Sequence, residues 1–251
     1  MSSPLRLAVR DDDLALAAER LARTGRTRLP MLFGEETWHL HQALLAPDQP
    51  WVRTFLNPLG VDITVEAFEA SSPEDQQQFI AGAYAGATEG LQFLFDRLRL
   101  GPARAMGSPT PQVLFDLLDR FNSPDFIDLA RRLTGDDRVA FSDGQVTRYL
   151  PGHFLNRHSD ANPRTERLYA YVLNLSPQWR AEWGGLLQFL DEAGDITETF
   201  VPSFGTLNVF AVPQMHAVST VAPFAGAPRY SVTGWWRAKP LASGPAASDA
   251  A

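Results

Sequence analysis

The chain has 251 residues, of which 45% are hydrophobic and 20% charged, a composition typical of a globular protein with a sizeable core. The formal net charge is −7 and no basic stripe is visible, which argues against nucleic acid as a partner. The sequence contains no cysteine, so disulfides and thiolate ligands are excluded and any metal must be held by His, Asp or Glu.

No run of residues approaches the roughly 18 apolar residues that a membrane span needs, so no contact with a membrane is expected. The first 25 residues carry Arg6, Arg10 and three aspartates and have no apolar stretch. This pattern predicts that no signal peptide is present and favours a cytoplasmic location.

The first half of the chain is predicted to be mainly helical. Residues 28–33 form a short strand-like run, and residues 101–111 are rich in Gly, Ala and Pro and are expected to form a loop. Ser72 is a predicted N-cap with Pro73 in the first turn, and Ser123 before Pro124 marks another helix start. The expected helices cover residues 13–24, 34–46, 71–100, 110–121 and 123–135.

From about residue 138 the pattern changes to short β-rich segments between turn signals. The expected strands lie within residues 138–150, 167–175, 185–191, 196–202, 206–212, 216–223 and 229–237. Strands at this spacing indicate a sandwich, a jelly roll or a barrel. Helices followed by strands favour an α+β fold with the N-terminal helices packed on one side of a β core.

The domain prediction is one domain over residues 1–240, with a helical part at 1–137 and a β core at 138–238. The low-complexity stretch 241–251 is predicted to be a disordered tail.

The segment Arg148-Tyr-Leu-Pro-Gly-His-Phe-Leu-Asn-Arg-His-Ser-Asp160 carries the first chemical signal. On a strand, residues i and i+2 project to the same face, so His158 and Asp160 can point into one cavity as a nitrogen and an oxygen donor. His216 follows 58 residues after His158, with enough strands between them for the chain to fold back beside itself. Two histidines and one carboxylate are the donor set of non-haem Fe(II) oxygenases, although Zn, Ni and Cu bind the same donors.

Taken alone, a His-x-Asp tripeptide is more often a solvated turn than a metal site. His153 is interpreted as a surface residue or a neighbour of the site. His39 and His41 stand two apart on a predicted helix, where such positions do not share a face, so they are assigned no chemistry.

The wider pattern resembles the prolyl 4-hydroxylase branch of the Fe(II)- and 2-oxoglutarate-dependent dioxygenases, over about residues 115–237. The nearest subgroup includes bacterial and translation-associated prolyl hydroxylases. The resemblance depends on the order and spacing of Tyr149-Leu-Pro-Gly152, His158-Ser-Asp160, Trp183-Gly-Gly185, Phe204-Gly205, His216 and Arg229-Tyr-Ser-Val-Thr-Gly-Trp235.

The resemblance implies a double-stranded β-helix, or jelly roll. It implies that His158, Asp160 and His216 hold Fe(II) as the catalytic metal and that 2-oxoglutarate chelates this iron. The far carboxylate of 2-oxoglutarate is expected to pair with Arg229, since a guanidinium matches a carboxylate bidentately and stays charged when buried. O2 is the further cosubstrate, with ascorbate as a candidate reductant.

Other cosubstrate contacts are expected around Arg229. Ser231 or Thr233, which alternate on the same strand face, can add a hydroxyl, and Tyr149 matches a family tyrosine that lines the pocket. Many relatives have a second tyrosine where this chain has Asn174, whose amide can still donate a hydrogen bond.

Further side chains of this pattern are expected to be structural. Tyr169 and Tyr171 are expected to face away from the pocket, and Trp235 can form a wall of it. Trp179 and Trp183 are interpreted as core packing.

The function that this resemblance implies is hydroxylation of a prolyl residue in a protein, with a translation component as the suggested partner and with release of succinate and CO2. Arg164 and Arg167 can contact an acidic partner, but solvated loop charges are the favoured interpretation. Alternatives are the same chemistry on a free amino acid or other small molecule, a metal-binding jelly roll that does not use 2-oxoglutarate, and a decayed binding module. A nucleic-acid demethylase is disfavoured because Trp235 stands where that branch has a second arginine.

Overall fold

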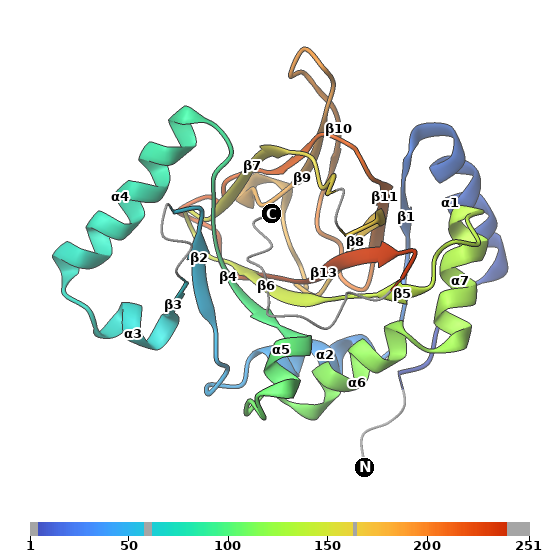
Figure 1. Cartoon of the computed structure of the whole chain (residues 1–251), viewed down its shortest axis with the longest axis horizontal. Helices are drawn as coiled ribbons and strands as arrows, with labels where there is room; N and C mark the ends of the chain where they lie inside the picture. Colours follow the sequence, from blue (N-terminus) through green and yellow to red (C-terminus); the bar gives the residue numbers. More distant parts are fainter. Residues whose placement is uncertain (1–4, 58–61, 163–164, 240–251) are drawn as a thin grey trace.

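The computed structural model describes residues 5–57, 62–162 and 165–239, which form helices around one curled antiparallel sheet (Figure 1). The helices are α1 (Asp11–Thr24), α2 (Glu36–Leu44), α3 (Val65–Ala70), α4 (Pro73–Glu89), α5 (Leu100–Ala105), α6 (Gln112–Phe121), α7 (Pro124–Thr134) and the 3₁₀ turn η1 (Ala181–Trp183). The strands are β1 (Arg26–Leu29), β2 (Val52–Phe55), β3 (Ile63–Thr64), β4 (Phe93–Arg99), β5 (Phe141–Ser142), β6 (Gln145–Tyr149), β7 (Phe154–His158), β8 (Arg167–Asn174), β9 (Leu187–Leu190), β10 (Ile196–Phe200), β11 (Leu207–Ala211), β12 (His216–Val218) and β13 (Arg229–Arg237).

The order of strands across the sheet is β1-β11-β8-β13-β6-β4-β7-β12-β9-β10, and β2 extends it from β4. Strand β4 joins the two halves, because its first residues pair with β7 and its last residues pair with β6. This curling places β7 and β12, which carry the two candidate histidine ligands, opposite β13, which carries Arg229. The prediction of an α+β fold is confirmed.

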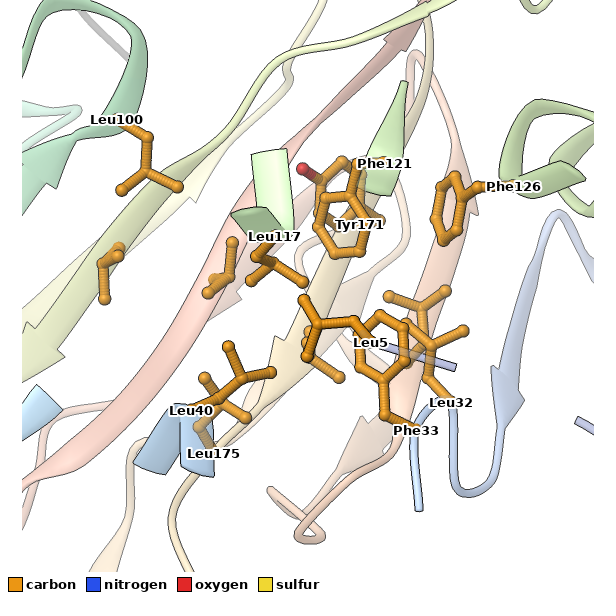
Figure 2. Packing of buried hydrophobic residues seen from close by; sticks show 14 of the residues in the cluster. Leu5, Leu32, Phe33, Leu40, Leu100, Leu117, Phe121, Phe126, Tyr171 and Leu175 are labelled. Atoms are coloured by element: carbon orange, nitrogen blue, oxygen red, sulfur yellow. The ribbon is translucent and has the colours of Figure 1, made fainter. Parts of the chain in front are cut away.

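The largest apolar core lies between the helices and the outer face of the sheet. Alternate residues of β13, such as Tyr230, Val232 and Trp236, point into this core and leave the intervening residues for the inner face. Helices α1 and α7 pack on each other and α2 and α5 pack on α6, so that they cover this face (Figure 1). Figure 2 shows Phe121 and Tyr171 near the centre of the drawn side chains, with Phe126 to their right.

The helix predicted over residues 71–100 is wrong in its second half. The structure has α4 over Pro73–Glu89 and then β4 over Phe93–Arg99. The apolar run of β4 also fits a helix by period, but its pairing with β2, β6 and β7 satisfies the backbone inside the sheet. Strands β2 to β4 therefore lie in the part of the chain that was predicted to be mainly helical, whereas β1 overlaps the strand-like run predicted at residues 28–33.

Helix boundaries follow the capping signals. The Ser72 side chain accepts a hydrogen bond from the Asp75 backbone N–H, as predicted, and Gly135 ends α7 in the left-handed conformation. The loop predicted over 101–111 instead contains most of the short helix α5. The predicted tail, residues 241–251, lies outside the described residues.

None of the helices in the described ranges combines the length and the apolar composition that a membrane span requires.

Candidate active site

Three side chains from two strands and one loop meet at the inner face of the sheet. His158 ends β7 and is the direct cross-strand partner of His216, which begins β12. Asp160 lies two residues beyond His158, and its carboxylate oxygens are 3.6 Å from His158 Nε2 and 3.5 Å from His216 Nε2. All three residues are buried, and one ligand atom from each lies within 4.8 Å of the others. The structure thus brings together the three predicted metal ligands.

Both imidazoles are oriented by main-chain carbonyls. His158 Nδ1 lies 2.9 Å from the Asn156 carbonyl oxygen, and His216 Nδ1 lies 2.8 Å from that of Gln214. Each Nδ1 therefore donates its hydrogen, and each Nε2 is turned toward Asp160, where it can coordinate a cation once it carries no proton. This tautomer is the one that a metal ligand of this geometry needs.

The charge states of the cluster also suit a cation. Burial and the neighbouring His158 lower the pKa of His216 to about 4, so this imidazole is neutral at neutral pH. Burial by itself would raise the pKa of Asp160, but the hydrogen bond with His158 and the charges of the two histidines outweigh it and lower the pKa to about 2. Two imidazole nitrogens and one carboxylate match the donor set of Fe(II) in non-haem oxygenases.

Arg229 begins β13, and its buried side chain lies on the same inner face. Its apolar neighbours there include Tyr149, Trp179 and Val221. The guanidinium carbon lies 5.2 Å from the centre of the Tyr149 ring. No acidic side chain of residues 5–57, 62–162 and 165–239 pairs with it in an ion bridge, and its Nε has no hydrogen-bond partner there.

A buried guanidinium without an anion is costly, and burial lowers the pKa of Arg229. The buried guanidinium of Arg229 therefore suits the carboxylate of a bound ligand, and the three potential metal ligands suit a divalent cation.

Comparison with known proteins places this arrangement in a family. Residues 144–237 match the family model of the 2OG-Fe(II) oxygenase superfamily, and this match includes His158, Asp160, His216 and Arg229. This part of the chain is a 2OG-Fe(II) oxygenase domain. This domain makes the protein a 2-oxoglutarate-dependent dioxygenase, and the matched superfamily implies Fe(II), 2-oxoglutarate and O2.

Solved structures of similar fold include prolyl hydroxylases and an oxidoreductase of the 2OG-Fe(II) oxygenase family. A prolyl-4-hydroxylase of Pseudomonas putida superposes with a TM-score of 0.55 at 17% identity, over 94% of this chain and 96% of its own. A 2OG-Fe(II) oxygenase family oxidoreductase of Burkholderia pseudomallei gives a TM-score of 0.58 at 15% identity, over 95% and 97%.

A third similar structure is a prolyl hydroxylase of Trichoplax adhaerens, in complex with a peptide fragment of the hypoxia inducible factor oxygen degradation domain. It gives a TM-score of 0.58 at 17% identity, over 90% of this chain and 91% of its own. These likenesses confirm the predicted jelly-roll fold. No curated protein matches the chain in sequence.

Two hydroxyl groups lie beside Arg229 in the oxygenase domain. Arg229 Nη1 donates to Ser231 Oγ at 3.4 Å, and Ser231 Oγ lies 2.8 Å from Thr147 Oγ1. Ser231 was predicted here, whereas Thr147 was not, because its position opposite Ser231 depends on the pairing of β6 with β13. Thr233 lies on the same face of β13 but is only half-buried, one pair farther along the strand.

Asn174 also reaches the inner face, as the cross-strand partner of Ser231 on β8. Its side-chain Nδ2 donates to the Thr206 carbonyl at 3.0 Å, and its Oδ1 has no partner in the described part of the chain. One amide hydrogen therefore supports the turn before β11, which leaves the second for a ligand. Tyr171 points away, as predicted, and donates to the Asp143 carbonyl.

The structure changes the interpretation of two residues. Of the two interpretations given for His153, a surface residue or a neighbour of the site, the first is wrong, because the residue is 4% exposed and lies near Asp96. Arg167 is not a solvated loop charge, because it begins β8 with its side chain buried against Asp160 and Trp235. Arg164 lies outside the described residues.

Proposed function

We propose that this dioxygenase hydroxylates a prolyl residue of a protein, with a translation component as the candidate partner. His158, Asp160 and His216 hold Fe(II), and Arg229 binds the far carboxylate of 2-oxoglutarate. The observation that carries the cofactor assignment is the buried Arg229, which has no acidic partner in the described part of the chain and lies on the same inner face as a compact His-Asp-His cluster.

Bound iron and 2-oxoglutarate supply an oxidative decarboxylation, in which one oxygen atom of O2 enters succinate and the other becomes the hydroxyl group of the product. The chain's own residues prepare the site for it. His158 and His216 present Nε2 because Asn156 and Gln214 fix the opposite nitrogens. Asp160 supplies the negative charge that neutralises part of the charge of the cation.

The pocket around Arg229 binds and orients the cosubstrate. Its guanidinium offers two parallel N–H groups to a carboxylate, and Ser231, held by Thr147, adds a hydroxyl. The apolar walls contributed by Tyr149, Trp179 and Val221 exclude water and strengthen this ion pair.

The prolyl substrate is supported by the order of the motifs and by the fold. Two of the similar structures are prolyl hydroxylases, and one of these was solved with a peptide fragment bound. We therefore propose that this chain accepts a peptide substrate. We also propose Asn174 and Thr233 as further contacts of 2-oxoglutarate.

Mass spectrometry of host lysate tests the substrate proposal. The lysate is incubated with Fe(II), 2-oxoglutarate and either the wild-type enzyme or the Asp160→Ala variant. The proposal expects a shift of about 16 Da, one added oxygen atom, on a proline of one peptide, only with the wild type. Oxidation confined to a small molecule of the lysate would instead indicate the alternative of a free amino acid substrate.

A further inference from the structure

The turn that carries Asp160 returns to the sheet at Arg167, the first residue of β8. Although its side chain is charged, it is only 2% exposed. Arg167 Nη1 lies 3.2 Å from the backbone carbonyl oxygen of Asp160 and 4.0 Å from its carboxylate Oδ1. The closer contact is therefore with the main chain of the metal-ligand residue, and the carboxylate itself stays directed toward the two histidines.

Trp235 fixes the position of this guanidinium. The Arg167 Cζ atom lies 3.6 Å from the centre of a Trp235 ring, which is the distance of a planar stack. Trp235 belongs to the inner face of β13, three positions along that face from Arg229. The stack thus connects the Asp160 turn to the strand that carries the cosubstrate arginine.

A second arginine serves the same turn at a different point. Arg237 Cζ lies 5.7 Å from the Trp235 ring, and its side chain pairs with Asp143 and donates to the Thr165 carbonyl at 2.8 Å. Arg237 therefore holds the far end of the turn, whereas Arg167 contacts Asp160 directly. This difference provides a matched control.

We propose that Arg167 is a positioning residue for the metal site, and that it fixes the main chain at Asp160 so that the carboxylate faces His158 and His216. The inference rests on the proposed metal ligands.

Two effects of Arg167 oppose each other. Its charge, 4.0 Å from the carboxylate, weakens the binding of a cation, while its bond to the Asp160 carbonyl preorganises the ligand. Orientation dominates, because residues that hold a metal ligand in place change metal affinity by roughly 10- to 100-fold when they are replaced.

The test measures Co(II) affinity from the visible d–d absorption of the bound ion, without any turnover. Arg167→Met removes the stack and the bond to Asp160, and Arg167→Lys keeps the charge but removes the planar fork. Both variants are expected to raise the Kd for Co(II) about tenfold or more. Arg237→Lys, the matched control at the other end of the turn, is expected to change it less than about threefold.

Folding is checked separately by circular dichroism and urea unfolding of the metal-free proteins, and Arg167→Lys decides the matter if Arg167→Met does not fold. The inference is overturned if folded Arg167→Lys binds Co(II) as tightly as the wild type, or if Arg237→Lys loses as much affinity. If the wild type does not bind Co(II), or if His216→Ala binds it with unchanged affinity, the proposed metal ligands themselves are wrong, and the role of Arg167 is not the cause.

Discussion

Thr147 and Ser231 lie opposite each other on β6 and β13, with their hydroxyl oxygens 2.8 Å apart inside an otherwise apolar pocket. Ser231 also accepts from Arg229, so the two hydroxyls and the guanidinium form one hydrogen-bonded chain. Thr147 holds Ser231, and Ser231 holds Arg229, whose guanidinium faces the proposed position of the carboxylate of 2-oxoglutarate.

The first prediction concerns this chain. Thr147→Val keeps the shape of the side chain and removes the hydroxyl, so that Ser231 loses its partner. We expect the affinity for 2-oxoglutarate to fall about three- to tenfold, the cost of about 1 kcal/mol that one hydrogen bond represents. Calorimetric titration of the anaerobic Mn(II) enzyme measures it, and unchanged affinity would show that Thr147 takes no part in the pocket.

The second prediction uses two glycines of similar backbone conformation. Gly185 has φ +61°, and a Cβ there would lie 2.9 Å from Arg229 Cδ, whereas Gly135 has φ +67° and open space around it. Alanine at either position is strained and should lower the free energy of unfolding by about 1 kcal/mol or more. Only Gly185→Ala should also weaken 2-oxoglutarate binding, because only it displaces Arg229.

The same calorimetric titration compares the two alanine variants. Equal 2-oxoglutarate affinities in Gly185→Ala and Gly135→Ala would contradict the role given to the close approach at Gly185.

The third prediction concerns a buried ion cluster on the outer face. Asp96 is fully buried and accepts hydrogen bonds from Arg53 at 2.8 Å and from Arg148 at 2.7 Å. Asp96→Ala leaves two guanidiniums without their counter-ion and should lower the free energy of unfolding by about 3–5 kcal/mol. Urea denaturation measures the loss, and Asp13→Ala, which breaks the exposed pair with Arg10, serves as the control with little expected change.

The fourth prediction is a pH dependence of stability at His153. Burial lowers the pKa of this imidazole from 6.5 to about 4, although the charge of Asp96 acts in the opposite direction. Between these two values the unfolded chain binds a proton that the folded chain does not, so stability is greatest above pH 6.5 and falls as the pH drops toward 4. The loss from this group is on the order of 3 kcal/mol.

Urea denaturation of the metal-free protein at pH 7.5 and pH 4.5 is the measurement for His153. The His153→Leu variant should lose distinctly less stability than the wild type over this interval, although His216 keeps its own contribution, since its pKa is also about 4. Identical pH profiles for the two proteins would contradict the prediction.

The sequence was informative where the chemistry follows a local spacing. His158 and Asp160 could be paired because a strand places residues two apart on one face, and the alternation of Arg229 and Ser231 followed the same rule. The strand β4 was missed because its apolar run fits a buried strand and a helix equally well, and only its three neighbouring strands decide between them.

Thr147 and Arg167 were missed for a different reason. The residues next to a threonine on a strand, or next to an arginine after a turn, do not predict that its side chain is buried. Their roles come from partners distant in sequence, Ser231 for the first and Trp235 for the second, which only the pairing of the strands brings near. The buried position of His153 depends in the same way on β2, β4 and β6.

The central claim is that one cavity binds a metal at His158, Asp160 and His216 and a carboxylate at Arg229. The most direct measurement is the visible spectrum of the protein after anaerobic addition of Fe(II) and then 2-oxoglutarate, compared with the variants His216→Ala and Arg229→Gln. We expect a weak metal-to-ligand charge-transfer band in the wild type, none in His216→Ala, and in Arg229→Gln a band only at about 100-fold higher 2-oxoglutarate, the loss expected for a buried charge-assisted pair. A wild type without this band, or an Arg229→Gln variant that develops it at the same 2-oxoglutarate concentration, would contradict the account.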